Sequence, residues 1–247
     1  MNCRSTLALL LLALPASVDA QIKILVHLSP ATAKNFDTYV DSAESKMDGT
    51  LKTAAKPGDI DLTPIDGSPI DIDGGMIHDW AAGVLVKGGT VEKALAVFQD
   101  YANYKKIFAP DVLNSQVLAH DGEHWTTALR LTRKNIVTVT YDAEYSIDYR
   151  KLDGGRWQIL ARSTKLRELD DDNQPLAEGT SQGFLWRLNS YWLIEPRPEG
   201  VYLECRAISL SRDIPAGLGW IVKPMIASVP RDSLRSTIEQ ARNAVTR

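Results

Sequence analysis

Residues 186–210 read WRLNSYWLIEPRPEGVYLECRAISL, two apolar-rich runs joined by the turn-forming segment Glu195–Gly200. This pattern predicts a β-hairpin that closes on Ile194 and Val201, so that opposed residues share a face. The face predicted to lie inside carries Trp186, Leu188, Ser190, Trp192, Leu203, Cys205 and Ala207. The other face, predicted to meet water with its charges compensating one another, carries Arg187, Asn189, Tyr191, Glu204, Arg206 and Ile208.

Further strands precede this hairpin. Alternating or apolar runs bounded by turn signals predict six strands near 113–119, 124–133, 136–150, 156–168, 182–194 and 201–211. An earlier strand starts at Met76, with Trp80, Ala82, Val84 and Val86 on one parity. Successive strands joined by tight turns pair as an antiparallel meander.

Helical spacing separates the first strand from the meander and returns at the end of the chain. It covers a helix from Thr90, a short helix at 104–108, and a final segment that Pro224 and Pro230 divide. After Asp232-Ser233 an apolar stripe is formed by Leu234, Ile238, Ala241 and Val245. Residues 76–247 are therefore predicted to be an α+β helix-grip domain, a curved seven-stranded antiparallel sheet wrapped around a long C-terminal helix. An apolar cavity between sheet and helix is the expected ligand site.

The first twenty residues have the pattern of a secretory signal peptide. Arg4 precedes the apolar run 7–14, and a small-residue exit ends at Ala20. Cleavage near Ala20 predicts an exported protein, periplasmic or extracellular. The run is shorter than a bilayer span, no later apolar stretch is long enough either, and an integral membrane span is not expected.

Residues 21–75 are predicted to form an N-terminal helical extension. Ser29 is a suitable N-cap followed by proline, and apolar residues recur at helical spacing through 29–47. Residues 57–75, rich in Asp, Pro and Gly without a sustained period, are interpreted as a linker.

Composition excludes several classes of function. The formal net charge of −3 provides no electrostatic basis for binding nucleic acid. Cys205 is the only cysteine after the predicted cleavage site, so no intramolecular disulfide is expected. No phosphate-binding glycine loop and no Gly-x-Ser-x-Gly elbow occurs, and no cofactor is predicted.

The chain resembles the START-like, or polyketide cyclase/dehydrase-like, superfamily, also known as SRPBCC or Bet v 1-like. The resemblance rests on the order of elements, on FQDYANYKKIFAP at 98–110 and on YWLIEPRPEG at 191–200. Residues 205–235 resemble an uncharacterised exported bacterial branch. The resemblance spans about 76–247 and implies a cavity for apolar or aromatic molecules, with enzymes in some branches.

Aromatic residues on the predicted inner face are the candidate cavity lining. The set comprises Trp80, Tyr141, Tyr145, Tyr149, Trp157, Trp186, Leu188, Trp192, Leu203 and Cys205. The tyrosine hydroxyls either bond within the core or orient a ligand. Cys205, on the apolar face, is interpreted as a small buried side chain.

The side of Arg162 depends on the turn at Asp153. A three-residue loop places Arg162 outside near acidic residues, and the binary pattern favours this register. A two-residue loop would place it among the tyrosines, where it could hold a carboxylate or enolate.

Metal sites are not predicted. An Asp121-Gly122 turn would send His120 and His124 to opposite faces. The run Asp71-Ile-Asp-Gly74 lacks the remaining ligands of a helix-loop-helix calcium loop and is interpreted as solvated linker, with weak calcium binding the lesser alternative.

Three functions stay open from the sequence. The favoured one is an exported binding protein for an apolar or aromatic small molecule, lipid-like or polyketide-like, without catalysis. A cyclase or dehydratase could use buried tyrosines and Arg162 in the same cavity. An interaction module could present the 29–47 helix to a protein partner; otherwise this helix docks on the outer sheet surface or gates the cavity mouth.

Overall fold

The computed structural model describes residues 26–47, 52–53, 59–134, 138–177, 180–181, 185–213 and 219–247. The predicted signal peptide lies outside these residues. None of the helices within them is long and apolar enough to cross a membrane.

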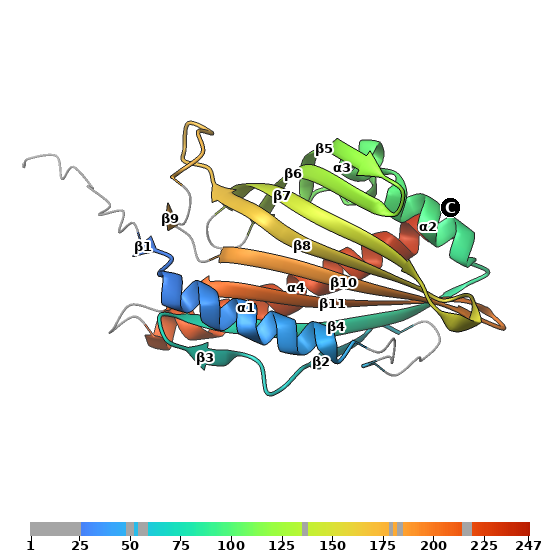
Figure 1. Cartoon of the computed structure of the whole chain (residues 1–247), viewed down its shortest axis with the longest axis horizontal. Coiled ribbons are helices and arrows are strands. Elements are labelled where there is room, and N and C mark those ends of the chain that lie inside the picture. Colours follow the sequence, from blue (N-terminus) through green and yellow to red (C-terminus); the bar gives the residue numbers. More distant parts are fainter. Residues whose placement is uncertain are drawn as a thin grey trace, which may run out of the picture.

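One antiparallel sheet dominates the molecule (Figure 1). Its seven long strands are β4 (Gly75–Lys87), β5 (Val112–Asp121), β6 (His124–Lys134), β7 (Thr138–Lys151), β8 (Trp157–Glu168), β10 (Leu185–Arg197) and β11 (Gly200–Arg212). Their order is β4-β11-β10-β8-β7-β6-β5, which places the first long strand beside the last. The seven predicted strands are thereby confirmed.

Two short strands extend the sheet beyond β4. β2 (Asp61–Pro64) and β3 (Ile70–Ile72) both pair with β4. Part of the segment interpreted as a linker is thus regular structure, because the exposed β4 edge offers unpaired backbone groups. A separate two-stranded pair joins β1 (Val26–His27) to β9 (Thr180–Ser181).

Helices cover both faces of the sheet. α1 (Pro30–Ser45) lies in front of it and α4 (Gly219–Thr246) behind it in Figure 1. α2 (Val91–Gln99), a 3-10 turn at Tyr101–Asn103 and α3 (Tyr104–Ile107) connect β4 to β5, and a second 3-10 turn at Asp153–Gly155 joins β7 to β8. We call the α4 side the inner face and the α1 side the outer face.

α4 runs through Pro224 and Pro230, so the predicted division at these prolines is wrong. Each proline costs the helix a hydrogen bond without ending it.

Two apolar cores result. The inner core joins Leu234, Ile238, Ala241 and Val245 of α4 to the inner face, as the stripe predicted. The outer core joins Phe36, Val40 and Ala43 of α1 to Ile77, Leu160, Trp186, Tyr191, Ile208 and Leu210. α1 begins as predicted, because the Ser29 side chain accepts a hydrogen bond from the Thr32 amide at 3.0 Å and Pro30 follows it.

The hairpin of β10 and β11 differs in register from its prediction. Ile194 pairs with Leu203 and Arg197 with Gly200, so the strands extend further than predicted. The slip is two residues and leaves each side chain on its predicted face. Trp186 is the exception, because a bulge between Leu185 and Arg187 turns it into the outer core.

Candidate functional site

The inner face is packed shut at the end that α2 and the last turns of α4 cover. Tyr149 donates a hydrogen bond to the Phe98 carbonyl at 2.7 Å, and its hydroxyl lies 2.8 Å from that of Tyr101. The ring of Trp192 lies 4.4 Å from that of Phe98. Leu203 and Cys205 are buried here, and burial raises the pKa of the Cys205 thiol. These four candidates for the cavity lining, Tyr149, Trp192, Leu203 and Cys205, therefore pack into the closed core at this end of the inner face.

The other half of the inner face is partly open. Trp80, Leu188, Ser190 and Ala207 are half-buried, although α4 packs on β4 and β11. More half-buried apolar residues of the inner core are Leu129, Leu131, Val139 and Leu185. This half therefore offers apolar surface that a ligand could cover.

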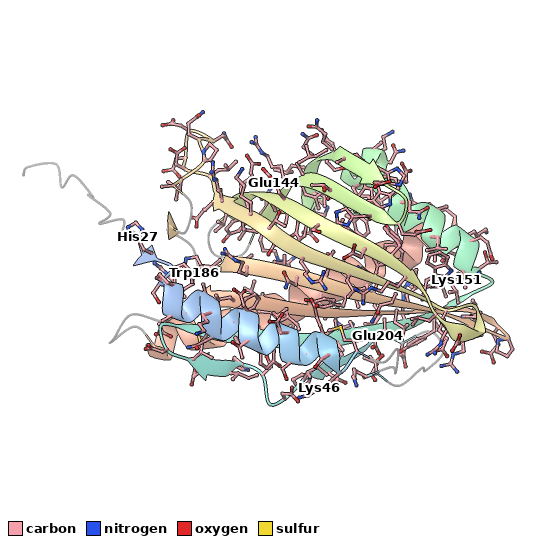
Figure 2. The ribbon with its side chains drawn as sticks, viewed as in Figure 1. His27, Lys46, Glu144, Lys151, Trp186 and Glu204 are labelled. Carbon is pink, nitrogen blue, oxygen red and sulfur yellow. The ribbon has the colours of Figure 1, made fainter. Side chains whose placement is uncertain are left out.

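The remaining aromatic candidates lie on the inner face as predicted. Tyr141 and Tyr145 are buried in the inner core, and Trp157 and Trp80 pack against it. Among the described residues the Tyr145 hydroxyl has no hydrogen-bond partner, and burial raises its pKa. Tyr145 is therefore neutral and keeps a free hydroxyl. Trp186, turned away by the bulge, is wrong as a cavity residue; Figure 2 labels it near the start of α1.

Arg162 lies on the outer face, as the three-residue loop predicted. Tyr149 pairs with Ile159 and Ser146 with Arg162, which fixes the register. Arg162 Nε donates to Glu44 Oε1 at 2.6 Å, and Arg162 Nη1 to Asp148 at 3.3 Å. Burial raises the pKa of Glu44, but hydrogen bonds from Arg162 and Tyr191 and the charge of Arg162 outweigh it and hold that pKa below its ordinary value.

The outer face of the last hairpin is buried, so its prediction as a solvated face is wrong. Arg206 Nε donates to Asp79 Oδ1 at 2.8 Å, and the Tyr39 hydroxyl donates to Asp79 Oδ2 at 2.7 Å. Glu204 accepts a hydrogen bond from the Thr53 amide at 2.8 Å. The prediction failed because strand parity separates two faces without showing which is covered. The signal was that Tyr202, Ile208 and Leu210 share the parity of the charged residues, so that β11 has apolar residues on both faces, which is typical of a strand buried on both sides.

Two pockets lined by described residues lie on this outer face. The larger, of about 220 Å³, opens between α1 and the loop after β2 and is lined by Tyr39, Ser42, Ala43, Lys46, Lys52, Ile65, Asp66 and Arg206. The smaller, of about 30 Å³, adjoins Met47 and Glu204. The expected cavity between sheet and α4 therefore stays a prediction, supported by the half-buried residues alone.

Sequence reasoning missed His78 on the inner face. Its side chain is 2% exposed, and its Nε2 lies 2.9 Å from Ser211 Oγ. Burial lowers its pKa to about 4, so it is neutral near pH 7. The signal was available, because His78 shares the parity of Trp80 and Ala82 on β4.

The two clustered histidines do not converge. His120 pairs with Trp125 and Asp121 with His124, so the turn is Gly122-Glu123, one residue later than predicted. The histidines still project to opposite faces; His124 Nδ1 lies 2.8 Å from Asp148, and His120 stacks on Trp125. In the described ranges no three His, Cys, Asp or Glu residues are grouped as metal ligands.

Known structures share this fold. A STAR-related lipid transfer protein from Xanthomonas axonopodis superposes with a TM-score of 0.55 and 18% identity, over 79% of this chain and 98% of that one. Human STARD10 gives 0.51 and 10%, over 89% and 81%. Human StAR-related lipid transfer protein 5 gives 0.50 and 11%, over 86% and 94%. No protein-family model and no curated protein matches the sequence.

Proposed function

Because the chain has the START-like helix-grip fold, we propose that it binds an apolar or aromatic small molecule between the inner face and α4 and releases it unchanged. The observation that carries this proposal is the half-buried apolar surface at Trp80, Leu188 and Ala207, under a helix that already covers the sheet. Each 100 Å² of this surface that a ligand covers would contribute about 2.5 kcal/mol of binding free energy.

The cyclase or dehydratase alternative loses the residue on which it depended. Arg162 was to stabilise an enolate among the tyrosines, but it is bound to Glu44 on the outer face. Tyr145 could still donate a hydrogen bond to a carbonyl. The enzyme hypothesis therefore keeps a hydrogen-bond donor without its cationic partner, and binding without reaction is favoured.

The interaction-module alternative loses its docking stripe. Phe36, Val40 and Ala43 of α1 are buried against the sheet, so they are not available to another protein. α1 also lies on the face opposite α4, where it does not gate the space between sheet and α4. Docking on the outer sheet surface is the reading that its contacts support.

Export is part of the proposal, on the signal-peptide pattern of residues 1–20. An export-competent bacterial host should release a mature form that starts at Gln21, which intact-mass analysis of periplasm and medium would show. Protein that keeps residues 1–20 and stays in the cytoplasm would contradict this part.

Ligand binding can be tested on the natively purified protein. Mass spectrometry should recover an apolar or aromatic compound, and the stripped protein should bind 1-anilinonaphthalene-8-sulfonate. Ala207→Trp, which fills the open half beside Trp80, should reduce dye binding about tenfold. Gln116→Trp on the exposed strand β5 is the matched control and should leave dye binding unchanged. A recovered compound that the protein converts would favour the enzyme, and equal dye binding by both variants would rule out this site.

A further inference from the structure

The open half of the inner face carries a polar patch, which we define as His78, Trp80, Ser209 and Ser211. β4 and β11 pair so that Ser209 lies opposite His78 and Ala207 opposite Trp80. His78, Ser209 and Ser211 are each at most 5% exposed. Polar groups at this depth cost free energy unless each donor and acceptor is bonded.

Two nitrogen atoms of this patch are not bonded. Nδ1 of His78 and Nε1 of Trp80 are buried, and neither has a hydrogen-bond partner within the described part of the chain. The two residues are two positions apart on one face of β4, so their Cα atoms lie about 7 Å apart. His78 cannot turn away without breaking its contact to Ser211 on the neighbouring strand. The patch is therefore held in position, while two of its nitrogen atoms have no hydrogen-bond partner among the described residues.

The chemistry of the two nitrogens determines which ligand group can form hydrogen bonds with both of them. The indole Nε1 of Trp80 donates and never accepts. A neutral imidazole whose Nε2–H donates to Ser211 presents Nδ1 as an acceptor; in the other tautomer Nδ1 donates. A hydroxyl satisfies the indole with its lone pairs and the imidazole with its hydrogen. A hydrocarbon satisfies neither, and a carboxylate would be a buried charge beside a histidine that burial keeps neutral.

Access to the patch comes from the same side as the proposed ligand. Trp80 is half-buried, and so are Ala207, which lies opposite it on β11, and Ser190, which lies opposite Ala207 on β10. A molecule that covers this apolar surface would therefore place its polar group beside Trp80 and His78.

We infer, on the basis of the proposed function, that the ligand is an apolar molecule bearing an alcohol or phenol hydroxyl, and that His78 Nδ1 and Trp80 Nε1 bind that hydroxyl. His78 and Trp80 are ligand-orienting residues in this assignment. Ser211 is a positioning residue that holds the imidazole.

Three matched probes test the assignment on the stripped full-length mature protein. 2-Naphthol donates and accepts a hydrogen bond, 2-methoxynaphthalene accepts one, and naphthalene does neither. Each is titrated against bound 1-anilinonaphthalene-8-sulfonate. 2-Naphthol should displace the dye at a concentration about tenfold below naphthalene, with the ether between them.

Substitutions show which residues cause the preference for 2-naphthol over naphthalene. Trp80→Phe removes the donor, and His78→Leu combined with Ser211→Ala removes the imidazole together with its partner. Both should reduce the preference for 2-naphthol over naphthalene, measured as the ratio of their displacing concentrations in the same variant, to less than about twofold. Trp186→Phe, the same change in the outer core, is the matched control and should keep the full preference.

The outcomes separate this inference from the proposed function. If no probe displaces the dye, both are overturned. If the three probes displace it equally, binding stands and the inference fails, since water would then complete the patch. A preference that survives in both variants also overturns the assignment. The wild-type series decides the first two outcomes even if a variant does not fold.

Discussion

Tyr145 and Tyr149 lie four residues apart on the inner face of β7, and both are buried. They differ in their hydroxyl groups. Tyr149 donates to the Phe98 carbonyl and adjoins Tyr101, whereas the Tyr145 hydroxyl has no partner among the described residues. The same side chain on the same strand is therefore structural at one position and available to a ligand at the other.

Replacement by phenylalanine should separate these roles. Tyr149→Phe loses a buried hydrogen bond and should lower the free energy of unfolding by about 1–2 kcal/mol. Tyr145→Phe removes a hydroxyl that bonds to nothing in the described protein and should change it by less than about 0.5 kcal/mol. Urea unfolding of both variants measures the difference. Equal losses would mean that the Tyr145 hydroxyl is also satisfied inside the core.

At the scale of elements, the sequence predicted α1 and its buried stripe but not what the stripe covers. Apolar periodicity shows that a helix packs on something and leaves the choice of surface to tertiary structure. The charges of Glu204 and Arg206 indicated water, yet residues 52–53 bring backbone donors to Glu204, and Asp79 of β4 pairs with Arg206 beneath α1. The bulge at Trp186 left no local signal, because a bulge depends on the partner strand. The seven long strands were predictable since their alternation and turn residues are local.

The docking of α1 can be tested through Phe36, which is 2% exposed in the outer core. Phe36→Ala should lower the free energy of unfolding by about 3–4 kcal/mol, because it leaves a cavity between α1 and the sheet. Hydrogen exchange should rise in α1 and stay slow in the last turns of α4, which belong to the other core.

Lys34→Ala, an exposed change on the same helix, is the control and should leave both exchange rates unaltered. Unchanged exchange of α1 in Phe36→Ala would show that the helix is held by its polar contacts at Glu44 and Tyr39 instead of by its apolar stripe.

At the scale of the molecule, one sheet separates two cores with different chemistry. The inner core is apolar and closes on α4, and its open half carries the polar patch of His78, Trp80, Ser209 and Ser211. The outer core holds the ion pairs of Asp79 with Arg206 and of Glu44 with Arg162. Removing one partner of such a pair is costly, so α1 is fixed in orientation as well as in place. This arrangement leaves the inner face as the side on which a ligand can be exchanged without displacing α1.

The burial of His78 on β4 predicts how the free energy of unfolding depends on pH. In the unfolded chain His78 titrates near 6.5, whereas burial lowers its pKa to about 4 in the folded protein. Between these values the unfolded state binds a proton that the folded state does not, so stability falls as the pH drops from 6.5 towards 4 and gains nothing from this group above 6.5. The loss should reach up to about 3 kcal/mol. Other carboxyl groups titrate in the same window, and comparison with His78→Gln, which carries no titratable ring, removes their contribution. Urea unfolding of both proteins at pH 7, 5.5 and 4.5 should therefore show that the variant loses less free energy of unfolding than the wild type as the pH falls. Equal losses in the two proteins would mean that the pKa of His78 is not lowered in the folded protein.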